Sequence, residues 1–224
     1  NTMGTLMQVH LIGGQLIYPF VDENWCEIPG LRDQIFATLH NIDAGPDHTL
    51  ALSIDLGGML VLAGNSAGLA AFETAMPQLQ GRFPVRLKNH AGFHTKMQAP
   101  VAELGKKALP QTLFGNPQIP VIDGRGAIWQ PYSSDAGAMW DYTLGHQVVE
   151  PYDFTAAVRT AARELMPDVF IVLGPGTTLG GAVAQSLIRC NWHMWHDKAD
   201  FQTAQKTRPQ LISMGMETQR ALVT

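Results

Sequence analysis

Residues 64–68 read Gly-Asn-Ser-Ala-Gly, a formal match to the G-x-S-x-G turn that presents the nucleophile of many serine hydrolases. Such a serine needs a base within reach and an acid that orients the base. In the chain order serine, acid, histidine, the candidates are Ser66, Asp123 and His146. A Ser or Asn at a strand-to-helix turn is also a preferred helix N-cap, because its oxygen accepts a hydrogen bond from a free backbone amide. The motif therefore leaves two interpretations of Ser66, a nucleophile or the start of a helix.

A second candidate is His94, which lies between a strand and a helix in the segment K-N-H-A-G-F-H-T-K-M-Q-A-P at 88–100. Such junctions commonly expose catalytic side chains on a rigid scaffold. His193 and His196 stand at i and i+3 and are two possible metal ligands, but the sequence offers no third ligand nearby. We therefore expect no metal site.

The elements that position these residues fall into two groups. Between residues 15 and 88 the periodicity predicts the order β-α-β-β-α-β, the ferredoxin-like pattern, with strands at 15–21, 49–54, 59–63 and 83–88 and helices at 30–42 and 67–76. After residue 88, predicted helices alternate with apolar strands at 119–122 and 169–173. The helices are expected at 96–109, at 153–165 and up to about residue 188. This second group predicts an α/β layer with a parallel sheet.

Composition excludes several classes of protein. Of 224 residues, 46% are apolar and 15% charged, which is enough to build a core, and the net charge of −4 with no basic run argues against nucleic-acid binding. No apolar run approaches the roughly 18 residues that a membrane span needs. Cys26 and Cys190 are the two cysteines, so neither a disulfide framework nor a zinc ribbon is indicated. We expect a cytoplasmic protein.

Four segments, taken in order, resemble one known family. They are A-G-F-H-T-K-M-Q-A-P at 91–100, P-Q-I-P-V-I at 117–122, E-P-Y-D-F-T-A-A-V at 150–158 and D-V-F-I-V-L-G-P-G-T-T-L at 168–179. They are similar to the A-F-H-S-x-x-M-x-P segment, the following short strand, the N-P-V-x-W helix start and the E-x-G-P-G-x-x-L ending of malonyl-CoA:acyl-carrier-protein transacylases and of the acyltransferase domains of polyketide and fatty acid synthases. The resemblance extends over residues 3–188.

The resemblance implies an α/β fold, a partial hydrolase-like parallel-sheet core with an inserted ferredoxin-like subdomain. Residues 1–14 would end an upstream core segment, 15–88 would form the subdomain, 89–188 the C-terminal part of the core, and 189–224 a C-terminal extension. In the family the nucleophile's G-H-S-x-G precedes the insert, whereas residues 61–66 resemble the insert's own V-V-I-A-G turn. Ser66 would then start a helix, and the nucleophile would lie in a missing N-terminal segment or on a second chain.

The family transfers acyl groups by a ping-pong mechanism without a cofactor. A serine takes the acyl group from a coenzyme A thioester, and the phosphopantetheine thiol of an acyl carrier protein then removes it. The resemblance implies that His94 is the base, which activates the serine hydroxyl and protonates the leaving thiolate. In the family a backbone carbonyl near the N-P-V motif orients this histidine, and that position corresponds to Glu150. We therefore expect acyl-CoA and an acyl carrier protein as partners.

The resemblance leaves the acyl group open. Met3, in M-G-T-L-M-Q at 3–8, stands where the family's R-G-x-x-M-Q has the arginine that pairs with the malonyl carboxylate, and a thioether cannot form that pair. A buried carboxylate without a partner is strongly disfavoured. Phe93, in contrast, resembles the A-F-H form of malonyl-type domains. Malonyl and an uncharged acyl group therefore remain alternatives.

Two other functions remain open from the sequence. A self-contained serine hydrolase would use Ser66, and a fluorophosphonate probe would label it. A degenerate, non-catalytic homologue would only bind a carrier protein. Met3 and the absence of the family's nucleophile motif from the sequence suggest this second alternative.

Overall fold

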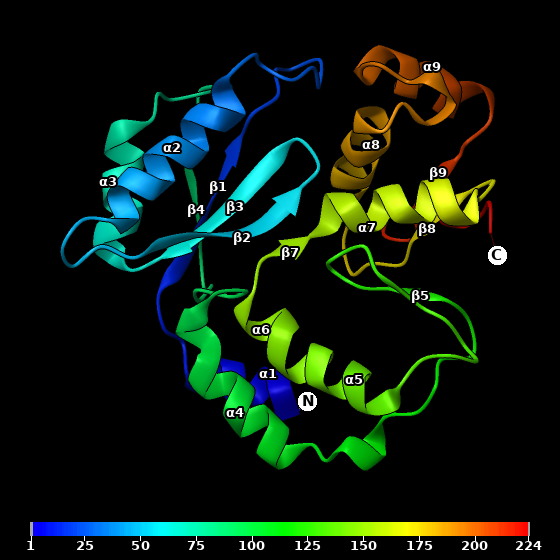
Figure 1. The fold of residues 1–224 in the computed structure, drawn as a ribbon. Coiled ribbons are helices and arrows are strands. Elements are labelled where there is room, and N and C mark those ends of the chain that lie inside the picture. Colours follow the sequence, from blue (N-terminus) through cyan, green and yellow to red (C-terminus); the bar gives the residue numbers. More distant parts are fainter. Residues whose placement is uncertain (1, 224) are drawn as a thin grey trace.

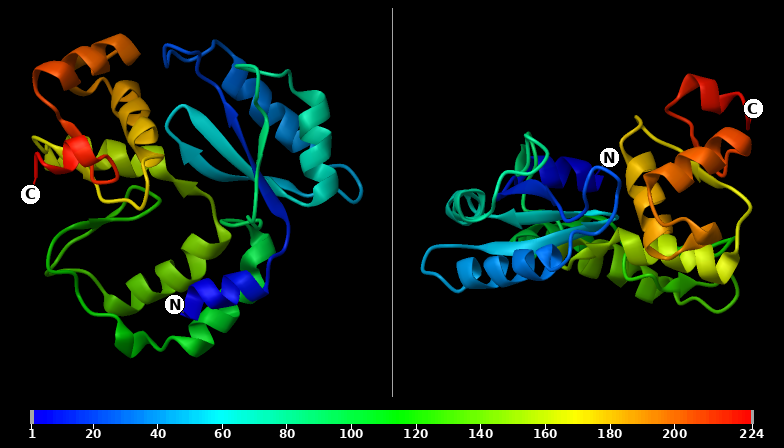
Figure 2. Two further views of the ribbon diagram at one scale, coloured as in Figure 1. Left: turned by 180° about the vertical axis from the view of Figure 1, so that it is seen from behind. Right: turned by 90° about the horizontal axis from the view of Figure 1, so that it is seen from above.

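The computed structural model describes residues 2–223 and has two halves, a sheet half over residues 14–87 and a helical half over most of the remainder (Figures 1 and 2). The sheet half contains β1 (Gly14–Pro19), α2 (Leu31–Asp43), β2 (Leu50–Leu56), β3 (Met59–Gly64), α3 (Ser66–Ala75) and β4 (Val85–Leu87). β1 pairs antiparallel with β3 and with β4, and β3 pairs antiparallel with β2. The element order predicted for residues 15–88 is therefore confirmed. A fifth strand, β7 (Tyr152–Asp153), joins the sheet parallel to β2 and comes from the helical half.

The core of the sheet half follows from period-two alternation. Leu16, Tyr18 and Phe20 project from one face of β1 and its continuation, and all three are fully buried. Helices α2 and α3 pack against each other and against the strands, and they contribute Ile35 and Phe72 to the same cluster. The Tyr18 ring meets the Phe72 ring edge-on at 5.5 Å. The Tyr18 hydroxyl donates to the Pro77 carbonyl at 2.6 Å, so its polar end is satisfied.

The helical half is built from short elements. Its helices are α1 (Thr2–Val9), η1 (Lys96–Gln98), α4 (Ala99–Ala108), η2 (Gln111–Leu113), α5 (Ala136–Asp141), the π-helix η3 (Tyr142–His146), α6 (Gln147–Val149), α7 (Phe154–Thr160), the π-helix η4 (Ala161–Leu165), α8 (Leu179–Arg189), η5 (Trp192–Met194), α9 (Lys198–Thr207) and α10 (Glu217–Arg220). The helices predicted at 96–109, at 153–165 and up to residue 188 are confirmed. None of the helices in residues 2–223 combines the length and the apolar character needed to cross a membrane.

The strands of the helical half differ from those expected. A strand forms within the predicted range 119–122, as β5 (Val121–Ile122), but it pairs antiparallel with β6 (Ile128–Trp129) and its residues are exposed or half-buried, so the expectation of a buried strand in a parallel sheet is wrong. The reason is local: the Asp123 carboxylate accepts hydrogen bonds from the backbone amides of Arg125 and Ala127, and this turn folds the chain back into a short hairpin. β8 (Phe170–Val172) forms where a strand was predicted. It pairs parallel with β9 (Leu211–Ser213), which belongs to the segment 189–224 that was predicted to be an extension outside the core. The division of the chain into four segments stays a prediction.

The tight turn between β2 and β3 joins the two halves. Gly57 has a φ of +70°, and a Cβ there would lie 2.6 Å from the Ala182 carbonyl oxygen of α8, so the close approach requires glycine. Beside this turn the buried Asp55 carboxylate pairs with Arg32 at 2.7 Å and with Arg189 of α8 at 3.3 Å. The junction therefore combines close backbone packing with an ion pair between Asp55 of the sheet half and Arg189 of the helical half.

Candidate active site

His94 lies on the loop between β4 and α4, where the two halves meet (Figure 1). Its φ of +56° is uncommon for a residue other than glycine, and such backbone conformations cluster at functional sites. The loop is held on both sides of this residue. The Gly92 amide donates to the Ile12 carbonyl at 2.7 Å, and the Thr95 hydroxyl donates to the Gly92 carbonyl at 2.6 Å. These bonds fix the backbone from which the imidazole projects.

The imidazole of His94 is oriented by a backbone carbonyl. Its Nδ1 lies 2.6 Å from the Gln147 carbonyl oxygen. Because a carbonyl only accepts, Nδ1 carries the proton and Nε2 keeps its lone pair. Burial lowers the pKa of His94 below its ordinary 6.5, and the bond to Gln147 opposes this shift only in part. The ring is therefore predominantly neutral at pH 7, the state that a general base needs.

The Gln147 carbonyl is available because of a proline. In a continuous α-helix this carbonyl would accept from the amide of residue 151, but that residue is Pro151, which has no N–H. Helix α6 follows the π-helix η3 directly and ends at Val149, before it can continue as a regular helix. A carbonyl without a helical donor can thus serve as the partner of His94.

The assignment of this carbonyl to Glu150 was wrong. Proline removes the donor from the carbonyl four residues before it, not from the adjacent one. Glu150 instead forms an ion pair with Lys96 at the surface. Pro151 is the signal in the sequence that the Gln147 carbonyl lacks a helical donor, but it does not indicate that His94 lies beside this carbonyl.

A cavity of about 370 Å³ brings three predicted residues together. It is lined by Met3, Met7, Phe93, His94, Thr143, Leu144, Gln147 and Val148. Helix α1 reaches it by packing along α4, where a Cβ on Gly105 would overlap the Met3 sulfur. The Tyr152 ring lies 5.6 Å from the His94 ring. His94 therefore borders a concave site that is large enough for a small acyl group.

A buried polar network behind His94 was not found from the sequence. The Gln15 side-chain amide of β1 donates to the Ser53 hydroxyl at 2.6 Å, and this hydroxyl donates to the Phe93 carbonyl at 2.8 Å. His90 Nδ1 lies 2.7 Å from the Gln15 side-chain oxygen. Ser53 falls at a register shift in β2, a β-bulge that turns its side chain toward the loop. No local pattern in the sequence predicts such a bulge.

Ser66 is not brought near a base. Asn65 is the N-cap of α3, since its side-chain oxygen accepts from the Gly68 amide at 2.8 Å, and Ser66 is the exposed first residue of the helix. Asp123 accepts from the Trp129 indole at 3.1 Å, while the His146 ring stacks on Tyr142. Across residues 2–223, no hydrogen bond joins any two of Ser66, Asp123 and His146. The described chain thus does not assemble this candidate triad.

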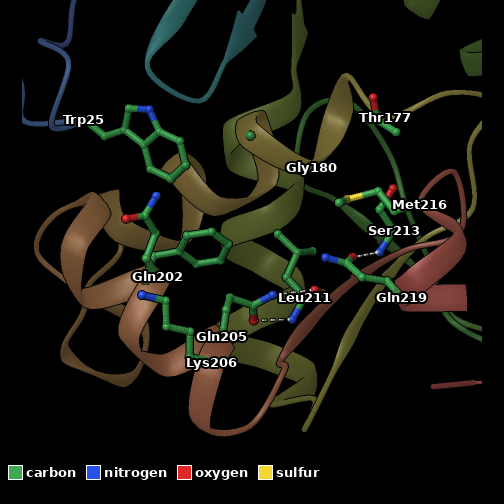
Figure 3. A pocket seen from close by; sticks show the side chains of 12 residues that line it. Trp25, Thr177, Gly180, Gln202, Gln205, Lys206, Leu211, Ser213, Met216 and Gln219 are labelled. Carbon is green, nitrogen blue, oxygen red and sulfur yellow. Dashed lines mark hydrogen bonds between the residues drawn. The ribbon is translucent and has the colours of Figure 1, made fainter. Parts of the chain in front are cut away.

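A second cavity of about 440 Å³ lies between α8, α9 and β9 (Figure 3). Trp25 and Phe201 form an aromatic wall, with ring centroids 5.7 Å apart. The side-chain amides of Gln205 and Gln219 are bonded to the backbone of Leu211 and Ser213, as the dashed lines in Figure 3 show. Since part of its polar lining is already partnered and no predicted site residue borders it, this cavity is not the candidate site.

No family model matches the sequence, and no curated protein sequence matches it. Solved structures match by fold. A malonyl-CoA:acyl carrier protein transacylase from Xanthomonas oryzae pv. oryzae has a TM-score of 0.67 at 16% identity, over 98% of this chain and 60% of that one. The acyltransferase domain from the second module of the salinomycin polyketide synthase has a TM-score of 0.64 at 19% identity, over 96% of this chain and 42% of that one.

A malonyl-transacylase in complex with its type II polyketide synthase acyl-carrier protein has a TM-score of 0.61 at 19% identity, over 83% of this chain and 56% of that one. The chain therefore has the α/β fold of these acyltransferases. It spans 60% or less of the length of these three structures.

Proposed function

We propose that this protein is an acyltransferase that moves a short acyl group, malonyl or another, from coenzyme A to the phosphopantetheine thiol of an acyl carrier protein. The observation that carries the proposal is the bond between His94 Nδ1 and the Gln147 carbonyl, which leaves a basic nitrogen on a ring that borders a 370 Å³ cavity. The fold shared with acyltransferases supports the same reaction class.

In the proposed reaction His94 moves one proton in each direction. Its Nε2 takes the proton from a serine hydroxyl while the serine oxygen bonds to the thioester carbon. The carbon–sulfur bond then breaks, and the imidazolium protonates the leaving coenzyme A thiolate. The carrier-protein thiol repeats these steps in reverse and removes the acyl group. Because the chemistry needs only proton transfer and substitution, we propose no cofactor.

The serine is proposed to come from outside residues 1–224, on the same polypeptide or on a second chain. Within residues 2–223, the hydrogen bond of the His94 ring is the one from Nδ1 to the Gln147 carbonyl, and no serine is hydrogen-bonded to the basic Nε2. Cys26 and Cys190 are both free thiols, which supports a reducing cytoplasm as the compartment.

Acyl-enzyme formation by the complete gene product tests the proposal. In a single turnover with acyl-CoA, followed by intact mass spectrometry, His94→Ala should slow acylation by about 100- to 10,000-fold, because the hydroxyl loses its base. His40→Ala, at an exposed site in α2, is the matched control and should leave the rate unchanged. An unaltered rate in His94→Ala would refute the proposed role.

The pH profile of the same reaction gives a second readout. Because burial lowers the pKa of His94, the imidazole is more than half unprotonated at pH 6.5, where an ordinary histidine is half protonated. The inflection in the pH profile of the acylation rate should therefore lie below pH 6.5, with a slope of one proton. An inflection at or above pH 6.5 would contradict this assignment of the base.

Ser66→Ala separates the acyltransferase from the other functions. We expect this variant to acylate at the full rate, since Ser66 only starts α3. Loss of acylation, together with loss of fluorophosphonate labelling, would favour the hydrolase that uses Ser66. Binding of a carrier protein without any acylation would favour a degenerate homologue.

A further inference from the structure

The cavity beside His94 has an apolar lining without a fixed charge. Five of its eight residues carry apolar side chains, namely Met3, Met7, Phe93, Leu144 and Val148. Thr143 and Gln147 are neutral, and within residues 2–223 no Lys, Arg, Asp or Glu borders the cavity. We infer that the acyl group bound here is uncharged and ends in hydrocarbon rather than in a carboxylate. This inference names the substrate class of the acyl transfer proposed above and rests on it.

Two methionines make the cavity suitable for a hydrocarbon chain. Met3 and Met7 lie at i and i+4, so they share one face of α1, and both border the cavity. Their thioethers are flexible and polarisable, which lets them adapt to acyl chains of different shape. Each methylene buried in such a lining should improve binding by about fourfold.

Two lysines on segments that adjoin the cavity are already paired. Lys96, on the segment that follows His94, forms an ion pair with Glu150. Lys106 of α4 pairs with Asp141, and its ammonium lies 5.4 Å from the centre of the Trp140 ring. Neither lysine borders the cavity. Within residues 2–223, a carboxylate on the acyl group would therefore find no counter-ion at this cavity, and a buried carboxylate without a partner is strongly disfavoured.

A carboxylate would also interfere with the base. His94 is the one ionisable residue among those that border the cavity. A negative charge within a few ångströms of it favours the imidazolium, which has no lone pair left to accept the serine proton. With an uncharged acyl group the imidazole stays neutral. Its Nδ1 is held by the Gln147 carbonyl, and its Nε2 can accept the serine proton.

A pair of isosteric thioesters tests the inference. 3-Methylbutyryl-CoA has two methyl groups where malonyl-CoA has two carboxylate oxygens, so shape is conserved and charge is not. In single turnovers of the complete gene product, 3-methylbutyryl-CoA should form the acyl-enzyme about 100-fold faster or more. Equal rates, or faster malonylation, would overturn the inference and leave the acyl transfer intact. Acylation by no thioester would overturn the acyl transfer and the inference with it.

Substitutions on α1 test which residues set this preference. Met3→Arg supplies a cation, and Met3→Gln is its uncharged control. The ratio of malonyl to 3-methylbutyryl loading should be at least about tenfold higher in the arginine variant. Because Met3 packs closely on Gly105, Met7→Arg and Met7→Gln form a second pair in case the first does not fold. An unchanged ratio in folded arginine variants would contradict the inference.

Discussion

The two halves of the molecule bury their apolar side chains differently. In the sheet half, α2 and α3 pack against the strands, and the residues of its core cluster are at most 7% exposed. In the helical half, Phe170 and Val172 of β8 pack into a second cluster, but Ile171 between them is 48% exposed and Leu173 80%. A strand that is apolar on both faces is buried only where elements cover both faces. The described residues do this for β3, where Leu60, Val61, Leu62 and Ala63 are at most 2% exposed, and not for β8.

The candidate site draws on both halves. The loop that carries His94 is anchored to the sheet half through Ser53, while the carbonyl that orients the ring comes from Gln147 in the helical half. A well-packed scaffold thus fixes His94 on one side. The other side supplies Gln147 and most of the residues that line the cavity.

The largest effect on stability is expected in the core of the sheet half. Phe72→Ala should lower the free energy of unfolding by about 3–5 kcal/mol, because it removes a fully buried ring and leaves a cavity. Urea denaturation followed by circular dichroism measures the change. Phe72→Leu keeps most of the volume and should cost clearly less. Equal losses in both variants would show that the edge-on contact with Tyr18, rather than volume, stabilises this core.

A smaller effect should separate two buried serines, one in each half. Ser53→Ala leaves both the Gln15 amide and the Phe93 carbonyl without their partner, and should cost about 1–3 kcal/mol. Ser213 of β9 is equally buried, but its hydroxyl has no hydrogen-bond partner. Ser213→Ala should therefore change the stability by less than about 0.5 kcal/mol or raise it.

The acylation rate decides whether Ser53 also positions His94. If it does, Ser53→Ala should slow acyl-enzyme formation and Ser213→Ala should not. Equal rates in the two variants would restrict Ser53 to a role in stability.

The smallest effect is expected at the exposed face of the helical half. Leu173→Ala should change the free energy of unfolding by less than about 0.5 kcal/mol, since the side chain is 80% exposed and loses little packing. Chemical denaturation of the complete gene product is the measurement. A loss above about 1 kcal/mol would mean that this face is covered in the complete protein, and the contrast between the halves would then be smaller.

Local patterns predicted the elements of the sheet half well because the periodicity of a strand or a helix is encoded within a few residues. Alternation in β1 and the helical spacing of Leu31 and Ile35 each place apolar residues on one face, and the neighbouring elements bury them. The same approach failed at 119–122, where the side chain of Asp123 closed a hairpin instead of a parallel crossover. The apolar run was correct as a signal for a strand but did not specify its partner.

The sequence by itself determined that His94 would be placed on a loop between a strand and a helix, and its resemblance to known acyltransferases indicated Met3 and Phe93 as residues that would border the acyl group. Only the tertiary structure decided that Gln147 would hold the imidazole, that Ser53 would anchor its loop, and that no Lys, Arg, Asp or Glu among residues 2–223 would border the cavity. The physical reason is that helix and strand periodicity is encoded within a few residues. The contacts of the site, in contrast, join residues about 40 to 50 positions apart and depend on a β-bulge, a π-helix and the missing amide of Pro151.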